Sequence, residues 1–438
     1  MRTHNIFIAA LLLSLLFGTI NSPGHEDGHS HQDDKTQLRE SPADGLIELY
    51  KSKISEDPDD YYNYTKLGES YIQKGREVGG IKPYHQAEQA LKKAVELYPD
   101  GYAAYIYLGQ VSSYTHNFQK TIEYAKKAIE LKPEKSVPYG LLGDAYMELG
   151  KYEEAGKAYQ IASIISPGFY SLSRISQLKD LTGDTNGAIL AMKESVEMAE
   201  SGNLPVENRA WANVMLGSLY LKEGKIEEAE GYYEKALAIF QDYYLALGQL
   251  AQLHTESGEY DEAAKLYERA IELNPRPQYY LALGKVYDEL GIPEKSKASY
   301  RKAEEGYQEY AKSGIRGHSR ELALYYADNG INLERALELA KRDSADTEDI
   351  YAFDTLAWAY YKTGNIDKAR DAINKSLRLG TKDAVLYYHA GMIYYKLDKN
   401  EEAEKYFSLV LTTNPFFDKD AVNNVRYALG ELGKSVSR

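Results

Sequence analysis

The chain has 438 residues, of which 27% are charged and 43% hydrophobic, a composition that excludes a wholly disordered protein. Its 52 lysine and arginine residues against 66 aspartate and glutamate residues give a net charge of −14. This argues against a general nucleic-acid binder, which needs a basic surface, and the absence of cysteine excludes disulfides, thiolate catalysis and cysteine-ligated metals.

Residues 1–22 are expected to be a signal peptide. An apolar run from Ile6 to Ile20 follows the polar residues Arg2 and His4. A run of this length is short for a membrane span and matches the apolar core of a secretory signal. We therefore expect the protein to be exported, periplasmic or secreted, with a membrane contact only through the leader if the leader stays uncleaved.

Residues 23–42 form a polar segment without hydrophobic periodicity, which predicts a disordered linker. The segment carries His25, His29 and His31 close to Asp33 and further carboxylates. Imidazole together with carboxylate suits a divalent ion such as zinc, nickel or copper. Two interpretations remain open, a solvated linker and a weak site for a divalent metal.

A 34-residue period dominates the rest of the chain. Prolines that end apolar helix patterns recur at this spacing, and so do Leu-Gly pairs within the patterns. The prolines are Pro99, Pro133 and Pro167, and two of the pairs are Leu108-Gly109 and Leu142-Gly143. One supersecondary unit is therefore copied along the chain.

Within each unit the apolar residues stand three and four apart, which indicates two helices. In the unit that ends at Pro167, small residues, Gly143 and Ala155, fall where the helices are expected to cross closely. Tyr146 and Tyr159 fill the space around the crossing, and Gly150 supplies the turn between the helices.

These residues resemble the tetratricopeptide repeat, in which a Leu-Gly pair, a tyrosine, a small alanine and a final proline recur every 34 residues. The resemblance implies an all-α fold, a right-handed superhelical solenoid of about ten helix-turn-helix repeats. Longer connections place units 1–4 at 61–200, units 5–7 at 201–315 and units 8–10 at 316–418. Residues 43–60 and 419–438 are expected to be capping helices, because a terminal repeat otherwise exposes its apolar face.

The sequence contains few of the motifs that are typical of enzymes. It holds neither a GxxxxGK[ST] phosphate loop nor a GxSxG nucleophile elbow. Its many carboxylates fall on the outward face of second helices, where solvation and pairing with lysine explain them. We expect no enzyme and no cofactor, apart from a possible divalent metal on the histidine-bearing tail.

The resemblance implies that the first helix of each unit lines a concave face, where ligand peptides lie. Aromatic and methionine side chains on such a face bury large area at low entropic cost, so they are typical of binding sites. The inward positions of the fifth, ninth and tenth units select Trp211, then Tyr351, Asp354, Trp358 and Tyr361, then Tyr388, Met392 and Tyr395. The alternative is that the neighbouring repeat or the last helix covers some of these side chains.

The sequence therefore predicts a non-catalytic scaffold of the cell envelope that holds a partner protein or peptide on the concave face of the superhelix. The resemblance does not identify that partner, and the negative charge disfavours nucleic acid. The alternative function is a metal-handling accessory protein of the envelope, in which the histidine-bearing tail binds a divalent ion.

Overall fold

The computed structural model describes residues 42–78, 81–312, 318–345 and 347–436. Every regular element in these ranges is helical, with 22 α-helices and one short 3-10 helix, η1 (Leu377–Leu379). No helix in the described ranges has the length and apolar character needed to cross a membrane. The chain divides after Tyr146 into two compact units, which are described separately below.

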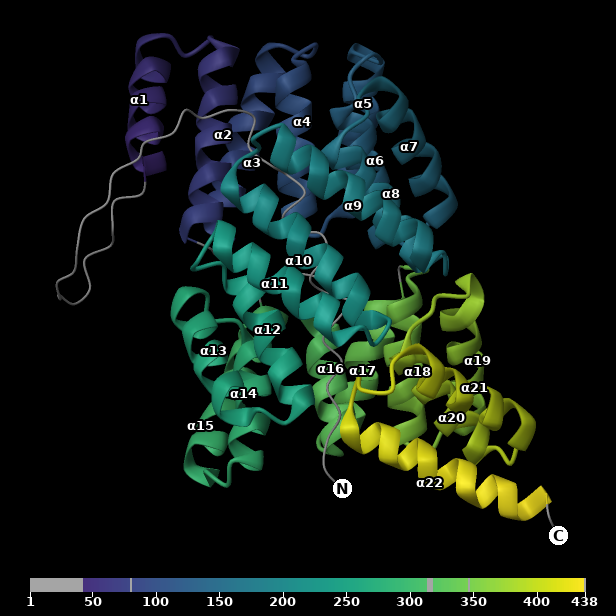
Figure 1. The fold of residues 1–438 in the computed structure, drawn as a ribbon. Coiled ribbons are helices and arrows are strands. Elements are labelled where there is room, and N and C mark those ends of the chain that lie inside the picture. Colours follow the sequence, from purple (N-terminus) through teal and green to yellow (C-terminus); the bar gives the residue numbers. More distant parts are fainter. Residues whose placement is uncertain (1–41, 79–80, 313–317, 346, 437–438) are drawn as a thin grey trace. The chain divides into compact units, whose positions relative to one another are not determined.

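The first unit contains the N-terminal helices, coloured purple to blue in Figure 1. Its core is apolar, with Leu67, Leu91 and Leu108 buried, and Ile47 of the first helix joins the same core. The helices are α1 (Pro42–Glu56), α2 (Tyr61–Val78), α3 (Lys82–Leu97), α4 (Tyr102–Tyr114), α5 (Phe118–Leu131) and α6 (Val137–Glu148), whose last residues fall beyond the boundary.

The second unit continues to the C-terminal end of the described chain (Figure 1). Its helices are α7 (Tyr152–Ile165), α8 (Phe169–Leu181), α9 (Thr185–Ser201), α10 (Val206–Lys222), α11 (Ile226–Ile239), α12 (Tyr244–Ser257), α13 (Tyr260–Leu273), α14 (Pro277–Glu289), α15 (Pro293–Lys312), α16 (His318–Asn329), α17 (Leu333–Ser344), α18 (Ile350–Lys362), α19 (Ile366–Ser376), α20 (Ala384–Lys396), α21 (Asn400–Thr413) and α22 (Lys419–Val436).

The helices α2 to α21 form ten consecutive pairs, each joined by a short connection, and this confirms the predicted all-α solenoid of about ten repeats. Small residues stand where the two helices of a pair cross, as the sequence pattern predicts. A Cβ atom added at Gly217 would lie 2.7 Å from the ring of Tyr233, and one at Gly284 would lie 2.7 Å from Tyr300. The Leu-Gly pairs therefore mark the closest approach of two helices.

Polar side chains fix where several helices begin. Asp184 accepts a hydrogen bond from the backbone N–H of Gly187 at the start of α9. Asp349 accepts from two backbone N–H groups at the start of α18, and Asp383 from one at the start of α20. Such caps satisfy donors that have no partner within the helix, so helix ends are set locally by sequence.

The first helix of each pair lies on the inside of the curve in the second unit. Successive first helices contact one another, α10 with α12, α12 with α14, α16 with α18 and α18 with α20, whereas successive second helices approach each other less. We call these first helices the inner helices. Side chains of neighbouring inner helices that point away from their partner helices therefore lie close to one another.

The curve of the second unit closes on itself. Residues about 200 positions apart meet at three successive turns, and we call this line of contacts the closing seam. The connections between paired helices that contain Gly150, Gly183 and Gly224 meet those before α18, α20 and α22. The seam includes a backbone hydrogen bond of 2.9 Å, donated by the N–H of Glu348 to the carbonyl of Leu149.

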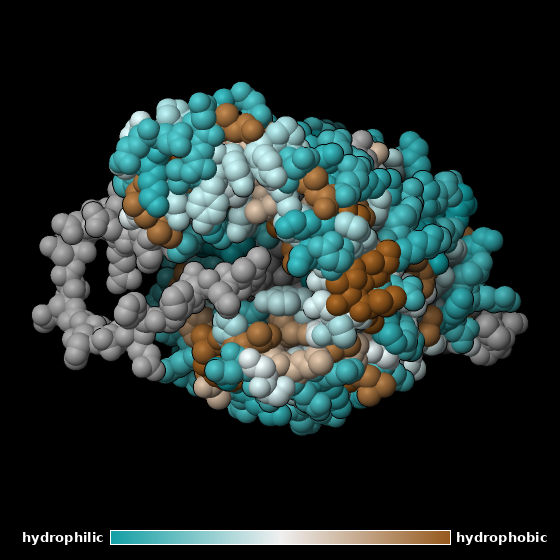
Figure 2. Space-filling view, turned by 90° about the horizontal axis from the view of Figure 1, so that it is seen from above, coloured by the Kyte–Doolittle hydropathy of each residue, from teal (hydrophilic) through white to brown (hydrophobic). Residues whose placement is uncertain are grey.

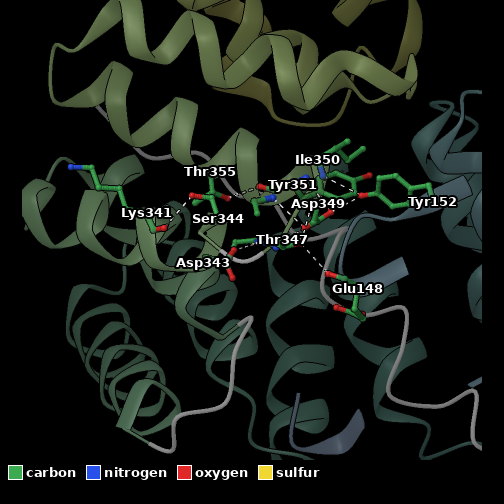
Figure 3. Close-up of polar contacts among 12 residues, drawn as sticks. Glu148, Tyr152, Lys341, Asp343, Ser344, Thr347, Asp349, Ile350, Tyr351 and Thr355 are labelled. Carbon is green, nitrogen blue, oxygen red and sulfur yellow. Dashed lines mark hydrogen bonds and ion pairs between the residues drawn. The ribbon is translucent and has the colours of Figure 1, made fainter. Parts of the chain in front are cut away.

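Side chains reinforce the first contact of the seam, which Figure 3 shows in close-up. The hydroxyl of Tyr152 donates to Asp349 Oδ1 at 2.9 Å and accepts from the backbone N–H of Ile350 at 3.1 Å. Thr347 Oγ1 donates to the carbonyl of Glu148 at 3.2 Å. The buried phenol and carboxyl thus satisfy each other across a sequence separation of 197 residues.

Candidate functional site

The outer surface is mainly polar. Over the face seen in Figure 2, hydrophilic side chains predominate and hydrophobic ones gather in smaller patches. Exposed large hydrophobic side chains are spread over several elements, among them Ile164 of α7, Leu190 of α9 and Tyr427 of α22. Isolated exposed hydrophobic residues need no functional explanation. The groups that do need one lie on the inner helices of the second unit.

Helices α16, α18 and α20 bring together a group that we call the Trp358 cluster: Asp328, Asp354, Trp358, Tyr361 and His389. The indole N–H of Trp358 donates to Asp328 Oδ1 at 2.7 Å. Its ring stacks on His389 with centroids 4.0 Å apart and on Tyr361 with centroids 4.9 Å apart. Three consecutive repeats therefore contribute to one aromatic stack with a carboxyl at its edge.

The imidazole of His389 is fully buried and held by a carboxyl of the preceding repeat. Its Nδ1 lies 2.9 Å from Asp354 Oδ1 and 3.1 Å from Oδ2. An ionised carboxylate can only accept, so Nδ1 is the donor in this pair. The other ring nitrogen, Nε2, has no hydrogen-bond partner, which leaves one oriented polar atom at the stack.

Burial shifts the pKa values of the charged groups around this cluster. It raises the pKa of Asp328 to about 6, against the attraction of Lys285, His389 and Lys362. Burial also lowers the pKa of Lys285 to about 8 and lowers that of Lys362, whose ammonium lies 5.1 Å from the centre of the Trp358 ring. The inner face here is a low-dielectric environment in which charges interact strongly.

Buried polar atoms without a partner gather on the inner helices. Of nine such side-chain atoms in the described part of the chain, six belong to inner helices of the second unit: Asp180 Oδ1 on α8, Arg209 Nε and Trp211 Nε1 on α10, Glu256 Oε2 on α12, Glu321 Oε2 on α16 and His389 Nε2 on α20. Buried polar groups in folded proteins are nearly always hydrogen-bonded, so this concentration needs an explanation.

Contacts within the chain do not offset the loss of solvation of two of these carboxyls, those of Glu256 and Glu321. Burial raises the pKa of Glu256 to about 8, although Gln252 donates to its Oε1 at 2.9 Å. Burial raises the pKa of Glu321 to about 7, against the attraction of Arg276 and Arg320. Each carboxyl still has one oxygen free to accept a hydrogen bond.

The structure brings together most of the aromatic residues predicted for the ninth and tenth units. Trp358, Tyr361 and Asp354 lie in the Trp358 cluster, and the ring of Tyr388 lies 5.9 Å from that of Trp358. Tyr388 also lies 6.2 Å from Phe417, just before the last helix. The expected cover by a neighbouring element therefore applies to this side chain.

The other predicted residues are more dispersed. Tyr351 lies at the start of α18, where its hydroxyl donates to Asp383 Oδ2 at 3.4 Å, and Tyr395 lies beside Phe407. Met392 packs at the edge of the same core. Trp211 is buried on α10, edge-on to Phe169 at 5.9 Å, away from the Trp358 cluster in sequence and contacts. Partner binding by all eight residues stays a prediction.

The predicted metal ligands His25, His29, His31 and Asp33 lie outside the described residues, so metal binding by the tail stays a prediction. Residues 25–29 have the HExxH spacing, which on a helix places two histidines on one face. Within the described ranges, no group of three or more histidine, aspartate or glutamate residues is arranged to hold a metal ion.

Sequence reasoning missed the polar half of the site. Asp328, His389, Glu256 and Glu321 were not among the predicted residues, because mainly aromatic and methionine side chains were selected for the inner face and carboxylates were explained by solvation. A usable signal existed: Asp354 and His389 stand 35 residues apart, close to one repeat period, on inner helices of consecutive units. Residues one period apart on the first helices should be read as neighbours.

The fold and the site together define an α-helical repeat protein whose inner helices carry the candidate binding surface. Two sequence profiles described as tetratricopeptide repeat match the chain, one over residues 208–286 and the other over residues 138–162, 277–305, 350–379 and 384–417. These matches coincide with helix pairs in the structure. The chain therefore contains tetratricopeptide repeats over these ranges.

Known relatives are distant. A TPR repeat-containing protein of Methanocaldococcus jannaschii is 25% identical over 309 residues, which cover 62% of this chain and 49% of the relative. The TPR repeat-containing protein YpiA of Bacillus subtilis is 26% identical over 235 residues, which cover 46% of this chain and 55% of the relative. The chain spans about half the length of these curated relatives. A solved structure of the human IFIT1 dimer with PPP-AAAA aligns with a TM-score of 0.48 at 15% identity, covering 77% of each chain.

Proposed function

We propose that the protein is a non-catalytic scaffold that binds an extended segment of a partner protein along the inner helices α8 to α20. The observation that carries this proposal is the concentration of unpartnered buried polar atoms on those helices. Tetratricopeptide repeats generally bind protein partners, and the presence of these repeats supports the proposal.

The chemistry of the unpartnered atoms fits a peptide. Trp211 Nε1 can only donate, and the carboxyls of Glu256 and Glu321 can donate when protonated and accept when ionised. A peptide backbone offers both carbonyl acceptors and N–H donors along its length. Each buried polar atom left without a partner costs about 1–3 kcal/mol, so a ligand that supplies the missing bonds gains affinity. Stacked aromatic rings such as Trp358 and Tyr361 add apolar contact area.

The test is selection of binders from a library of linear peptides on the purified full-length protein, followed by variants of the inner helices. Trp211→Phe removes the unpartnered N–H but keeps a ring in the core. We expect this variant to lose affinity for the selected peptide, by about fivefold or more. The free protein should not lose a hydrogen bond, because the indole N–H makes none there.

Variants of the aromatic stack extend the test. Tyr361→Ala should weaken peptide binding, because the half-buried phenol stacks on Trp358 at the inner face. Tyr427→Ala is the matched control, since this tyrosine of α22 is 72% exposed and should not affect binding. Equal affinities for both variants, with unchanged helicity by circular dichroism, would count against the inner face as the binding surface.

Export and a role in the cell envelope belong to this proposal through the predicted leader. The alternative function, metal handling by the histidine-bearing tail, predicts that activity depends on the tail and not on the inner helices. Deletion of residues 23–42 should leave peptide binding intact if the scaffold function is correct. Loss of high-affinity zinc binding on the same deletion, in a protein that selects no peptide, would favour the metal-handling function instead.

A further inference from the structure

The closing seam determines how a ligand can reach the inner helices. It links three successive connections within the second unit, so the seam is a line of contacts that extends over several repeats. Its three contacts are Leu149 with Glu348, Gly183 with Gly380, and Leu221 with Asn414. Because the chain between residues 149 and 348 returns to its own start, these repeats form a closed turn.

The seam leaves no room for a side chain between the two edges at its first two contacts. A Cβ atom added at Gly150 would overlap the backbone of Glu348 and Asp349, and one added at Gly183 would lie 2.5 Å from the carbonyl oxygen of Gly380. At the third contact, Asn414 Nδ2 donates to the carbonyl of Leu221 at 2.9 Å. The backbones therefore approach each other directly at the first two contacts, and the Asn414 side chain joins the two edges at the third.

Buried polar contacts hold the seam shut. Arg320 pairs with both Asp343, at 2.8 Å, and Asp349, at 2.5 Å, while Asp349 also accepts from Tyr152 across the seam. These side chains are largely shielded from water. Opening the seam would break the hydrogen bond between Tyr152 and Asp349 and leave the buried carboxylate with fewer partners, which is costly.

From this geometry we propose that the partner segment reaches the inner helices by a free end, passing lengthwise through the closed turn. This inference rests on the proposed function, and it defines the partner as an extended polypeptide with at least one accessible terminus. A folded domain, or an internal loop tethered at both ends, would require the seam to open. A partner that threads in needs no such opening.

The experiment compares three forms of one peptide selected from the linear library: the free peptide, the peptide fused at one end to a small folded domain, and the peptide fused at both ends to such domains. The host protein is tested as it is and with the seam locked by an engineered disulfide, Glu148→Cys with Thr347→Cys. The native chain has no cysteine, so this pair cannot mispair with another thiol. Each single cysteine variant is the matched control.

We expect the free and singly fused peptides to bind the native and the locked protein alike. The doubly fused peptide should associate with the native protein at least about 100-fold more slowly, because binding then requires the seam to open, and it should not bind the locked protein. Reduction of the disulfide should restore the slow association. The single cysteine variants should behave as the native protein.

Binding of the doubly fused peptide to the locked protein, with an association rate close to that of the singly fused peptide, would overturn the inference while leaving the proposed function standing. Loss of free-peptide binding on locking would overturn it as well, since it would show that ligands enter through the seam. If no peptide binds the native protein in any form, the proposed function fails and this inference fails with it.

Discussion

The closing seam makes a sharp prediction at Gly150. Its backbone has a φ of +72°, a conformation that favours glycine, and it lies against the backbone of Glu348 and Asp349. Gly150→Ala therefore adds two penalties, one from the strained backbone and one from the overlap. Gly291→Ala is the matched control, because Gly291 has a φ of +71° and no atom within 4 Å of an added Cβ.

The two variants separate the two penalties by magnitude. The left-handed backbone costs alanine about 1–2 kcal/mol relative to glycine, and this cost is common to both. Forcing extra volume into a packed site costs a further 1–3 kcal/mol, roughly, and applies only at Gly150. We therefore expect Gly150→Ala to lower the free energy of unfolding of the second unit by about 1–3 kcal/mol more than Gly291→Ala does.

Urea unfolding followed by circular dichroism gives the difference in stability, and hydrogen exchange gives its location. The N–H of Glu348 donates to the carbonyl of Leu149, so its exchange should accelerate in Gly150→Ala and stay slow in Gly291→Ala. Equal stability losses in the two variants, with Glu348 equally protected in both, would show that the seam is not formed in solution.

Three further predictions follow from named contacts. Tyr152→Phe should cost about 1–3 kcal/mol in urea unfolding, because it removes one hydrogen bond from the buried Asp349 carboxylate and leaves the backbone N–H of Ile350 without its acceptor. Gly284→Ala should destabilise by about 1–3 kcal/mol through overlap with the facing tyrosine ring, whereas Gly231→Ala, with open space around its Cβ, should be neutral or stabilising. Glu256 has a folded-state pKa of about 8 against an ordinary value of 4.5, so the folded state holds its proton and stability falls as pH rises from 4.5 to 8. Glu256→Gln should match the native protein in thermal unfolding near pH 4.5 and exceed it at pH 8, and a pH-independent gap would contradict this assignment.

The sequence could predict the helix pairs because their determinants are local and repeated. Gly150, predicted as the turn between two helices, lies between α6 and α7, and Pro167, predicted to end a helix, follows the end of α7. Glycines at helix crossings and prolines at helix ends act within one unit. Because they recur every 34 residues, the repeat period is enough to predict the helix pairs. The count of about ten repeats follows from the same period.

The closing seam could not be predicted in this way. Its contacts join residues about 200 positions apart, and the distance depends on the small rotation between each pair and the next. A change of a few degrees per repeat, summed over six repeats, would move Tyr152 away from Asp349 altogether. Gly150 was predicted as a turn residue, but its second role, close approach to another connection, cannot be recognised from the repeat period.

The candidate site was likewise predicted only in part, because some of its contacts depend on how neighbouring repeats are oriented. The repeat register, together with what the family resemblance implies, placed Trp358 and Tyr361 on an inner helix, and the structure puts them together in one stack. Their partners Asp328 and His389 depend on how three consecutive repeats are oriented, which the register does not state. Aromatic residues were also easier to select, because a carboxylate on a helix is usually a solvated charge.

The seam and the site are two consequences of one curvature. Packing between the inner helices buries carboxyls there, so they lose solvation and their pKa values rise, as they do for Glu256, Glu321 and Asp328. Variants that loosen the seam should therefore lower these raised pKa values and weaken ligand binding together, because both depend on the same enclosure.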